Sequence, residues 1–125
     1  MDKKIIATDK SPAAIGPYSQ AIAVGNFLFT SGQSPVDPAT GEIAGSDITA
    51  QAEQVMKNLD AVLTEAGTKF ENAIKTTCFL ADMADFAAFN AVYGKYFTTH
   101  PARSCVAVKT LPKNVLCEVE VIAEI

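Results

Sequence analysis

The sequence predicts an α+β fold in which two helices pack on one face of a mixed β-sheet. Two segments carry apolar residues at helical spacing, and five carry the alternation or the short apolar runs that are typical of strands. Their order along the chain is two strands, a helix, a strand, a helix and two strands, and a short strand at 4–7 is a candidate to precede them. Two helices cover only one side of such a sheet, so the expected architecture is an α+β sandwich with one uncovered sheet face.

The first two predicted strands form a hairpin within residues 18–36. Two short apolar runs are split there by Gly25-Asn26, and a glycine-containing pair between such runs is a hairpin signal. The segment that follows, DPATGEIAGSD, is dense in Pro, Gly, Asp and Thr. It predicts a surface turn that ends in a helix start at Ser46 or Asp47.

Two amphipathic helices enclose the next predicted strand. Apolar residues recur at steps of three and four over 48–66, and Gly67 is a natural terminator for that helix. The segment 72–81 alternates two sets of side chains, as a strand does. Asp82 and Asp85 open the second helix. Its apolar stripe consists of Phe86, Phe89, Tyr93, Tyr96 and Phe97.

The last two predicted strands lie on either side of a turn at 111–114. The first is PARSCVAV, residues 101–108, and the second is VLCEVEVIAEI, residues 115–125. Strict alternation in the second strand separates two faces. The apolar face carries Cys117, Val119, Val121 and Ala123, and the other carries Leu116, Glu118, Glu120 and Ile122.

Length and composition predict one domain over residues 1–125. A chain of 125 residues buries roughly two-thirds of its unfolded surface on folding, which is enough for a hydrophobic core without disulfides or a structural metal. Hydrophobic residues make up 49% and charged residues 19% of the chain, which excludes disorder. No apolar run approaches the roughly 20 residues of a membrane span, and the first residues, MDKKIIATDK, lack the apolar core of a signal peptide. We therefore expect no membrane association.

The cysteines and the charge indicate a cytoplasmic protein that does not bind nucleic acid. Cys78, Cys105 and Cys117 cannot all pair within one chain and show no CxxC spacing, so reduced thiols are expected. The formal charge is −4 and the lysines are scattered. Affinity for a phosphate backbone depends mainly on a concentrated basic patch, so this charge pattern disfavours such a partner.

The sequence predicts neither a metal nor a cofactor. His100 is the only histidine, and the chain shows no set of ligands at compatible spacing. The glycines form neither GxGxxG nor GxxxxGK, so no nucleotide cofactor is expected. For Cys105, the reading as a small buried hydrophobe is preferred to that of a nucleophile activated by His100.

The uncovered sheet face predicts a homo-oligomer. The strands carry Ile, Val, Phe and Leu on both sides, although the helices cover only one side. An exposed apolar face on a small protein usually marks a subunit interface. Any functional site is therefore expected at the seams between subunits.

Arg103 is the leading candidate for function. It precedes Cys105 by two residues, so both side chains share one face of the predicted strand. A guanidinium keeps its charge and needs either water or a planar anion. The turn at 111–114 is expected to bring Glu118 close to Arg103, within one chain or across an interface. An arginine for a carboxylate and a glutamate for a water would make a small-acid hydrolysis site.

Other readings of these residues stay open at this point. Arg103 can be a solvated arginine at a strand end, and Glu118 a solvent-facing residue like Glu120. Tyr18 can be a strand-edge aromatic and Ser31 a turn residue. Asn90, on the stripe of the second helix, can satisfy a buried backbone group.

Several segments together closely resemble the RidA family, also called YjgF, of imine deaminases. They are IGPYSQAI, FLFTSGQSPVDPATGEI, KTTCFLADMADFAAFN and PARSCVAV, followed by the acidic last strand. The resemblance covers essentially the whole chain in the same order. It implies a chorismate-mutase-like α+β fold and a homotrimer with clefts between neighbouring subunits. It also implies cofactor-free hydrolysis of 2-aminoacrylate and 2-iminobutanoate, which leak from pyridoxal-phosphate-dependent dehydratases, to 2-oxo acids and ammonia.

The resemblance also implies roles for individual residues. Arg103 falls on the arginine that holds the substrate carboxylate, and Glu118 on the acid that orients the attacking water. The implied substrate-binding positions are Arg103, Tyr18, Ser31, Gly32, Asn90 and Cys105. One departure is the short TTH before PAR, where many relatives carry several more residues, which leaves the preferred substrate size open.

Three other functions are alternatives to the deaminase. A regulatory protein would bind 2-oxo acids through the same arginine without turnover, and would not need the acid at Glu118. Ribonuclease and chaperone-like activities have also been associated with the family. The acidic charge counts against the ribonuclease, and burial of apolar surface in a trimer counts against the chaperone.

Overall fold

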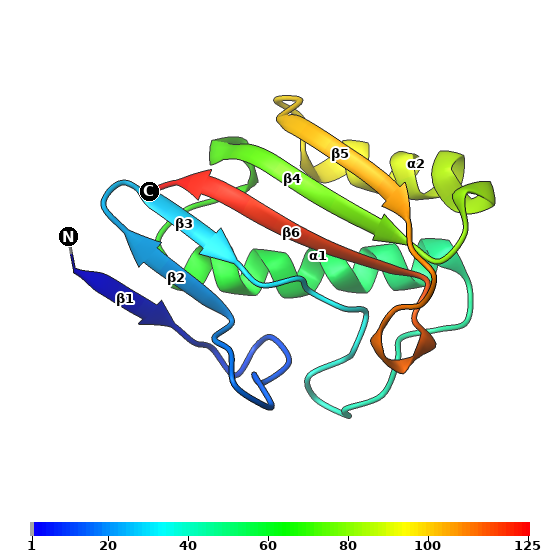
Figure 1. Ribbon diagram of the computed structural model, residues 1–125, viewed down its shortest axis with the longest axis horizontal. Helices are drawn as coiled ribbons and strands as arrows, with labels where there is room; N and C mark the ends of the chain where they lie inside the picture. The colour runs from blue at the N-terminus through cyan, green and yellow to red at the C-terminus, as the bar shows by residue number, and fades with distance from the viewer. Residues whose placement is uncertain (1) are drawn as a thin grey trace.

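A single six-stranded mixed sheet organises the computed structural model, which describes residues 2–125. The strands lie in the order β1-β2-β3-β6-β4-β5 (Figure 1). Neighbouring strands are antiparallel except for β4 and β5, which are parallel. The predicted mixed sheet is confirmed, including the short first strand. The strands are β1 (Lys3–Ile6), β2 (Ala21–Val24), β3 (Phe27–Thr30), β4 (Ala73–Leu80), β5 (Ala102–Ala107) and β6 (Cys117–Glu124).

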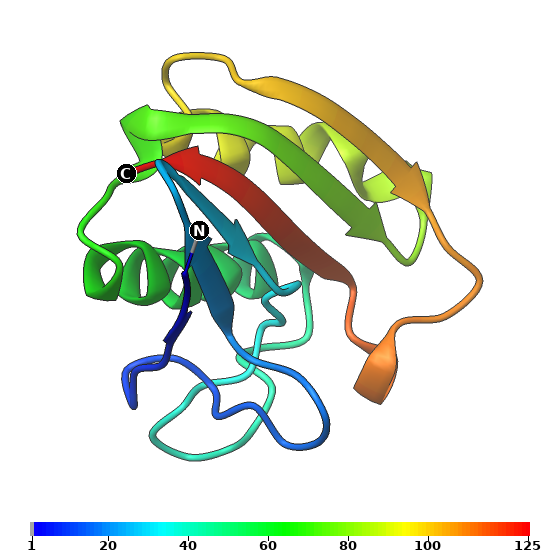
Figure 2. The same cartoon turned by 60° about the vertical axis from the view of Figure 1, so that its left-hand side comes forward.

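Two α-helices, α1 (Ile48–Glu65) and α2 (Phe86–Tyr96), pack on the same face of this sheet (Figure 2). Asp47 begins α1 as predicted, because its Oδ1 accepts a hydrogen bond from the Ala50 amide at 2.8 Å. Asp82 instead caps a 3₁₀ turn over 83–85 that leads into α2. Within residues 2–125, no helix is both long enough and apolar enough to cross a membrane.

The β2–β3 hairpin turns at Gly25-Asn26, as predicted. Gly25 has a φ of 58°, a left-handed conformation that costs glycine little because it has no Cβ. The predicted turn at 111–114 is a 3₁₀ turn over Pro112–Asn114. It leads into β6, which crosses to the middle of the sheet.

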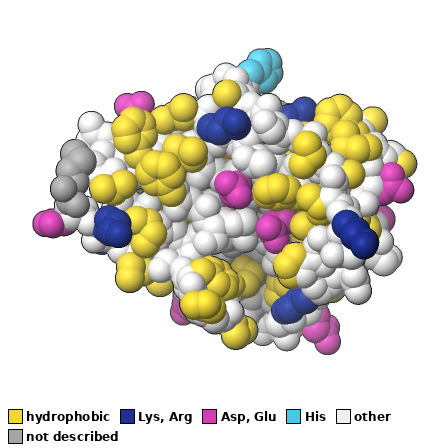
Figure 3. Space-filling view, viewed as in Figure 1, with side chains coloured by type: hydrophobic (Ala, Val, Ile, Leu, Met, Phe, Trp, Pro, Cys, Tyr) yellow, Lys and Arg dark blue, Asp and Glu magenta, His cyan; other side chains and the backbone are white. Residues whose placement is uncertain are grey.

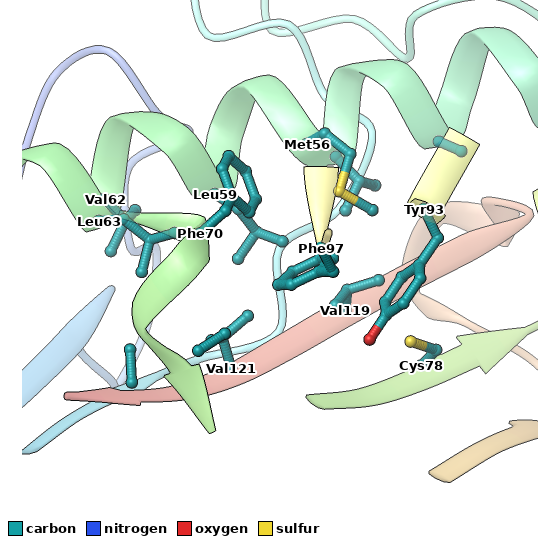
Figure 4. Packing of buried hydrophobic residues seen from close by; sticks show 14 of the residues in the cluster. Met56, Leu59, Val62, Leu63, Phe70, Cys78, Tyr93, Phe97, Val119 and Val121 are labelled. Carbon is teal, nitrogen blue, oxygen red and sulfur yellow. The ribbon is translucent and has the colours of Figure 1, made fainter. Parts of the chain in front are cut away.

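The hydrophobic core lies between the sheet and the two helices. Val119 and Val121 of β6 alternate toward the helices as predicted, and residues of α1 such as Met56 and Leu59 cover them (Figure 4). Each such side chain contributes about 1.5–3 kcal/mol when it is fully buried. The three cysteines are free, and burial raises the pKa of Cys78 and of Cys117 to about 12. Both thiols are therefore neutral parts of the core.

The other face of the sheet is uncovered, as the sequence predicted. Figure 1 looks onto this face with the helices behind the sheet, and Figure 3 shows hydrophobic side chains gathered on it around acidic ones. Phe27 and Phe29 of β3 are 44% and 43% exposed. Large aromatic side chains at this exposure form an apolar surface of the kind that subunits bury on association.

Candidate active site

The predicted site residues lie in two groups on opposite faces of the sheet. Arg103 and Cys105 of β5 stand beside Thr76 and Cys78 of β4, which are both fully buried on the helix side. Glu118 alternates with the buried positions of β6 and therefore points to the uncovered face. The same-face prediction for Arg103 and Cys105 is confirmed, while Glu118 belongs to a different surface.

Of the two arrangements expected for Arg103 and Glu118, within one chain or across an interface, the structure excludes the first. The strand β4 lies between β5 and β6, so the two strands are about 10 Å apart even where they run level. The sheet itself also separates the two side chains. The turn over 112–114 does not fold β6 back along β5, because β6 pairs with β3 and β4 instead. A small molecule cannot contact both groups of one chain.

One face of α2 holds the Arg103 guanidinium. Its Nη1 donates a hydrogen bond to Asn90 Oδ1 at 2.7 Å. Its Cζ lies 4.8 Å from the centroid of the Tyr93 ring and 5.4 Å from that of Phe86. Both separations are within the roughly 6 Å at which a cation is attracted to an aromatic face. Positions 86, 90 and 93 are four and three residues apart, so these side chains share one side of the helix.

The held guanidinium keeps most of its donors for a ligand. An arginine carries five N–H donors, and Asn90 accepts from one of the two nitrogens that form the end of the fork. Within residues 2–125 the one ion pair joins Lys95 to Glu53, so no carboxylate of the chain lies at ion-pair distance from Arg103. A half-buried cation without an internal acid is suited to an external planar anion.

Asn90 acts on Arg103 in this structure. Its side-chain oxygen accepts from the guanidinium rather than from a backbone group, so the alternative considered for it from the sequence is not its role. This bond fixes the direction of the arginine fork. Direct contact of Asn90 with a substrate stays a prediction.

Cys105 supplies a small uncharged wall next to Arg103. The side chain is half-buried, and burial raises the pKa of its thiol, with the Arg103 charge opposing that effect only in part. The thiol is therefore protonated at neutral pH and is a poor nucleophile. This agrees with the preferred interpretation of Cys105 as a packing residue.

Glu118 is a half-buried carboxyl group whose proton affinity is increased. Burial raises its pKa, and the negative charge of Glu120 on the same face raises it further. A carboxyl group shifted in this direction exchanges its proton closer to neutral pH. It is therefore better suited to act as both base and acid than an exposed glutamate.

Gly32 leaves room for the Glu118 carboxyl group. A Cβ at position 32 would lie 2.8 Å from the carboxyl carbon of Glu118, which is closer than carbon atoms pack. The backbone here is fixed by its neighbours, because Gln33 and Val119 exchange two backbone hydrogen bonds of 2.8 and 3.2 Å. The glycine thus allows the carboxyl group to lie directly over a rigid backbone segment.

Ser31 connects this carboxyl group to the segment that carries Tyr18. The Ser31 amide donates to Gln20 O at 2.8 Å, and its hydroxyl donates to Ser19 O at 2.5 Å. Tyr18 is the next residue in this segment, 54% exposed, and lines a groove of about 450 Å³ with the first strand. The structure thus brings Gly32 and Glu118 together, with Ser31 adjacent in the chain, whereas Tyr18 lines the groove along the first strand.

Tyr93 and Phe86 were missed as site residues from the sequence. Their spacing and apolar character predicted core packing, which is correct for Tyr93 but incomplete for both. The signal that was available is the polar Asn90 between two aromatic residues on one side of an amphipathic helix. Among residues 2–125, no three metal-ligating side chains gather, so the geometry offers no metal centre there.

Comparisons with known proteins place the chain in a family. A family model described as Endoribonuclease L-PSP matches residues 8–125. The proposed regulator AldR of Lactococcus lactis is 57% identical over 98% of both chains. The 2-iminobutanoate/2-iminopropanoate deaminase of Escherichia coli is 51% identical over 96% of both chains.

Solved structures of the same family share the fold. The YjgF gene product of Escherichia coli has a TM-score of 0.91 at 50% identity, over 97% of this chain and 98% of that one. Escherichia coli TdcF with bound serine has a TM-score of 0.93 at 45% identity, over 98% of both chains. The chain therefore belongs to the RidA (YjgF) family, which its sequence resembles.

We predict that Gly32→Ala lowers the raised pKa of Glu118. The new methyl group takes the place of the carboxyl group, whose flexible end moves toward water, so the effect of burial is reduced. Unfolding free energy should change by less than about 1 kcal/mol, because only a flexible side chain has to move. The measurement is an NMR titration of the Glu118 carboxyl carbon.

Gly94→Ala is the matched control, because nothing lies within 4 Å of an added Cβ at that position. It should leave the Glu118 titration unchanged. A Glu118 pKa that stays fully raised in Gly32→Ala would contradict the assigned role of Gly32.

We predict that Glu118→Gln stabilises the protein increasingly as pH rises. The folded-state pKa of Glu118 is raised, so the wild type is most favoured below the unfolded-state pKa of about 4.3 and loses stability as pH rises through the folded-state pKa. Glutamine has no such loss. Urea unfolding at one protein concentration across pH 4 to 8 measures the difference. Glu120→Gln should reduce the slope only in part, and a pH-independent difference for Glu118→Gln would refute the buried-carboxyl interpretation.

Proposed function

We propose that this protein is an imine deaminase that hydrolyses short 2-imino and enamine acids to 2-oxo acids and ammonia. The observation that carries this proposal is the Arg103 guanidinium, which α2 holds in place without an acidic partner among residues 2–125. A substrate carboxylate is the planar anion that fits such a fork. The name of the Escherichia coli relative, 2-iminobutanoate/2-iminopropanoate deaminase, supports the choice of substrate.

The complete site in this proposal is a cleft between two copies of the chain. Arg103 and Glu118 lie on opposite faces of one sheet, so one chain alone does not bring them together. In the proposed assembly, Arg103 of one copy faces Glu118 of the next. Contacts between two different patches of the same chain close into a ring when the rotation between copies is a whole fraction of a turn. The family resemblance implies a ring of three with three equivalent clefts. The exposed face with Phe27 and Phe29 provides apolar surface for this assembly.

The proposed reaction needs positioning and one proton shuttle. Arg103 holds the carboxylate, and Glu118 accepts a proton from a water molecule as the water oxygen bonds to the imine carbon. That proton passes from Glu118 to the nitrogen, which gives a tetrahedral adduct with one hydroxyl and one amino group. Glu118 then transfers the hydroxyl proton of the adduct to the nitrogen, the carbonyl forms as the carbon–nitrogen bond breaks, and imino acid plus water become oxo acid plus ammonia. An enamine first takes a proton at its terminal carbon to give the imine. General acid–base catalysis of this kind contributes about 10²- to 10⁴-fold.

The remaining predicted residues shape the cleft in this account. The neutral Cys105 thiol forms a small wall beside the carboxylate, and Gly32 leaves space for the Glu118 carboxyl group. Tyr18 and Ser31 bring hydroxyl groups to the rim. The connection between α2 and β5 is only five residues, 97–101, so the assay should include imino acids of several lengths.

Regulation by ligand binding is the second candidate function. The relative AldR is a proposed regulator, and TdcF was solved with bound serine, a small amino acid. A binding protein would use Arg103 in the same way but would not need a proton shuttle at Glu118. A ribonuclease, which the name of the family model suggests, is disfavoured by the net charge of −4.

We predict that Arg103→Ala lowers the rate of imine hydrolysis about 10- to 100-fold, because it removes hydrogen bonds to a charged group. A threonine dehydratase supplies 2-iminobutanoate, and the release of 2-oxobutanoate is followed. Arg103→Lys should also lose most of the rate, since a point charge cannot make two parallel bonds. Lys109→Ala removes an exposed cation near β5 and serves as the control with no expected effect.

The outcomes separate the candidate functions. A wild type that does not speed oxobutanoate release would refute the deaminase proposal. If the wild type shows no turnover but binds 2-oxobutanoate, and the Arg103→Ala variant does not bind it, a regulatory role through ligand binding is favoured. Cleavage of RNA that survives Arg103→Ala would favour a nuclease.

A further inference from the structure

We propose that Tyr93 is a positioning residue that holds the Arg103 guanidinium in the orientation that grips the substrate carboxylate. The link to turnover rests on the proposed function, but the link to Arg103 does not. Tyr93 lies on α2, whereas Arg103 lies on β5. Their contact places an aromatic ring 4.8 Å from the guanidinium carbon.

The Tyr93 ring is fixed on several sides. Phe97 stacks on it with a centroid separation of 4.5 Å and an interplanar angle of 25°, and Phe89 lies at 5.9 Å. The side chain is only 8% exposed. Figure 4 shows it reaching from α2 toward β4, with its hydroxyl group at the end next to the strand. A packed ring of this kind has little freedom to tilt.

The Tyr93 hydroxyl group is bonded to the strand residue that lies next to Arg103. It forms a buried hydrogen bond of 2.7 Å with Thr76 Oγ1 on β4. Thr76 is the register partner of Arg103 on the neighbouring strand, one strand spacing of about 4.8 Å away. The bond therefore ties the ring to the part of the sheet from which Arg103 extends.

Tyr93 differs from the other two contacts of Arg103. Asn90 fixes one nitrogen of the fork, and Phe86 is half-buried and has no polar group to anchor it. Burial raises the pKa of Tyr93, so its hydroxyl stays neutral and keeps the bond to Thr76. Tyr93 is thus the contact that combines a packed ring with a polar anchor.

A guanidinium held in this way loses little freedom when it binds. A mobile arginine gives up rotamer entropy to form two parallel bonds, and a pre-oriented one has lost it already. The effect of Tyr93 should therefore fall on ligand binding. The proton shuttle at Glu118 belongs to the other surface and should be unaffected.

The test compares Tyr93→Leu and Tyr93→Phe in three measurements. The order parameter of the Arg103 Nε–Hε bond from NMR relaxation should drop in Tyr93→Leu and stay close to wild type in Tyr93→Phe, which keeps the ring. Tyr93→Leu should weaken 2-oxobutanoate binding about three- to thirtyfold, the range of cation–aromatic contacts from exposed to desolvated sites. In the deaminase assay KM should rise by a similar factor, while kcat stays within about threefold.

Phe70→Leu is the control for a loss of core packing. Phe70 is buried in the same aromatic cluster, against Tyr96 and Phe97, and has no contact with Arg103 among those described. It should lower thermal stability without changing the Arg103 order parameter or 2-oxobutanoate affinity.

Two results would overturn the role of Tyr93. One is an order parameter of the Arg103 Nε–Hε bond that is the same in Tyr93→Leu as in the wild type. The other is a loss of 2-oxobutanoate affinity in Tyr93→Leu that is no larger than the loss in Phe70→Leu. A wild type without turnover would instead refute the deaminase proposal. The relaxation measurement would still decide the role of Tyr93 in that case, because it needs no substrate.

Discussion

The position of β6 in the middle of the sheet is the constraint on which the rest of the structure depends. β6 pairs with β3 on one side and β4 on the other, so its alternate residues fill the core under the helices. The same alternation places Glu118 on the uncovered face. It also leaves β5 as an edge strand, where Arg103 is reached by α2 but not by any acid of β6.

This separation keeps both charged groups available. Had Glu118 stood beside Arg103 in one chain, the pair would have neutralised each other and occupied the place of an anionic ligand. Instead the guanidinium is held by an amide oxygen and aromatic rings, none of which carries a full negative charge. Glu118 is partly buried and lies near the carboxylate of Glu120, and both effects favour its protonated form. In the proposed function, a second copy of the chain supplies the other half of each site.

Local patterns predicted the elements of the fold, while long-range pairing decided the site. Steps of three and four and alternation of two are properties of short segments, so the helices, the hairpin and the shared face of Arg103 and Cys105 followed from the sequence. The order of strands depends on contacts between distant segments. The sequence therefore left open whether Arg103 and Glu118 meet within one chain, which the strand order excludes. The sequence predicts only core packing for Tyr93. Its contact with Arg103 follows from the pairing of β4 with β5, which puts Thr76, the hydrogen-bond partner of Tyr93, beside Arg103.

The most direct test of a site shared between subunits is complementation between two inactive variants. Arg103→Ala and Glu118→Gln chains are mixed in equal amounts, unfolded, refolded together and assayed for imine hydrolysis. If each cleft takes Arg103 from one chain and Glu118 from another, about one quarter of the clefts in random ring assemblies are intact, and about a quarter of the wild-type rate returns. If both residues came from the same chain, every cleft would keep one lesion. The mixture would then stay as inactive as its parents, which would contradict the shared site.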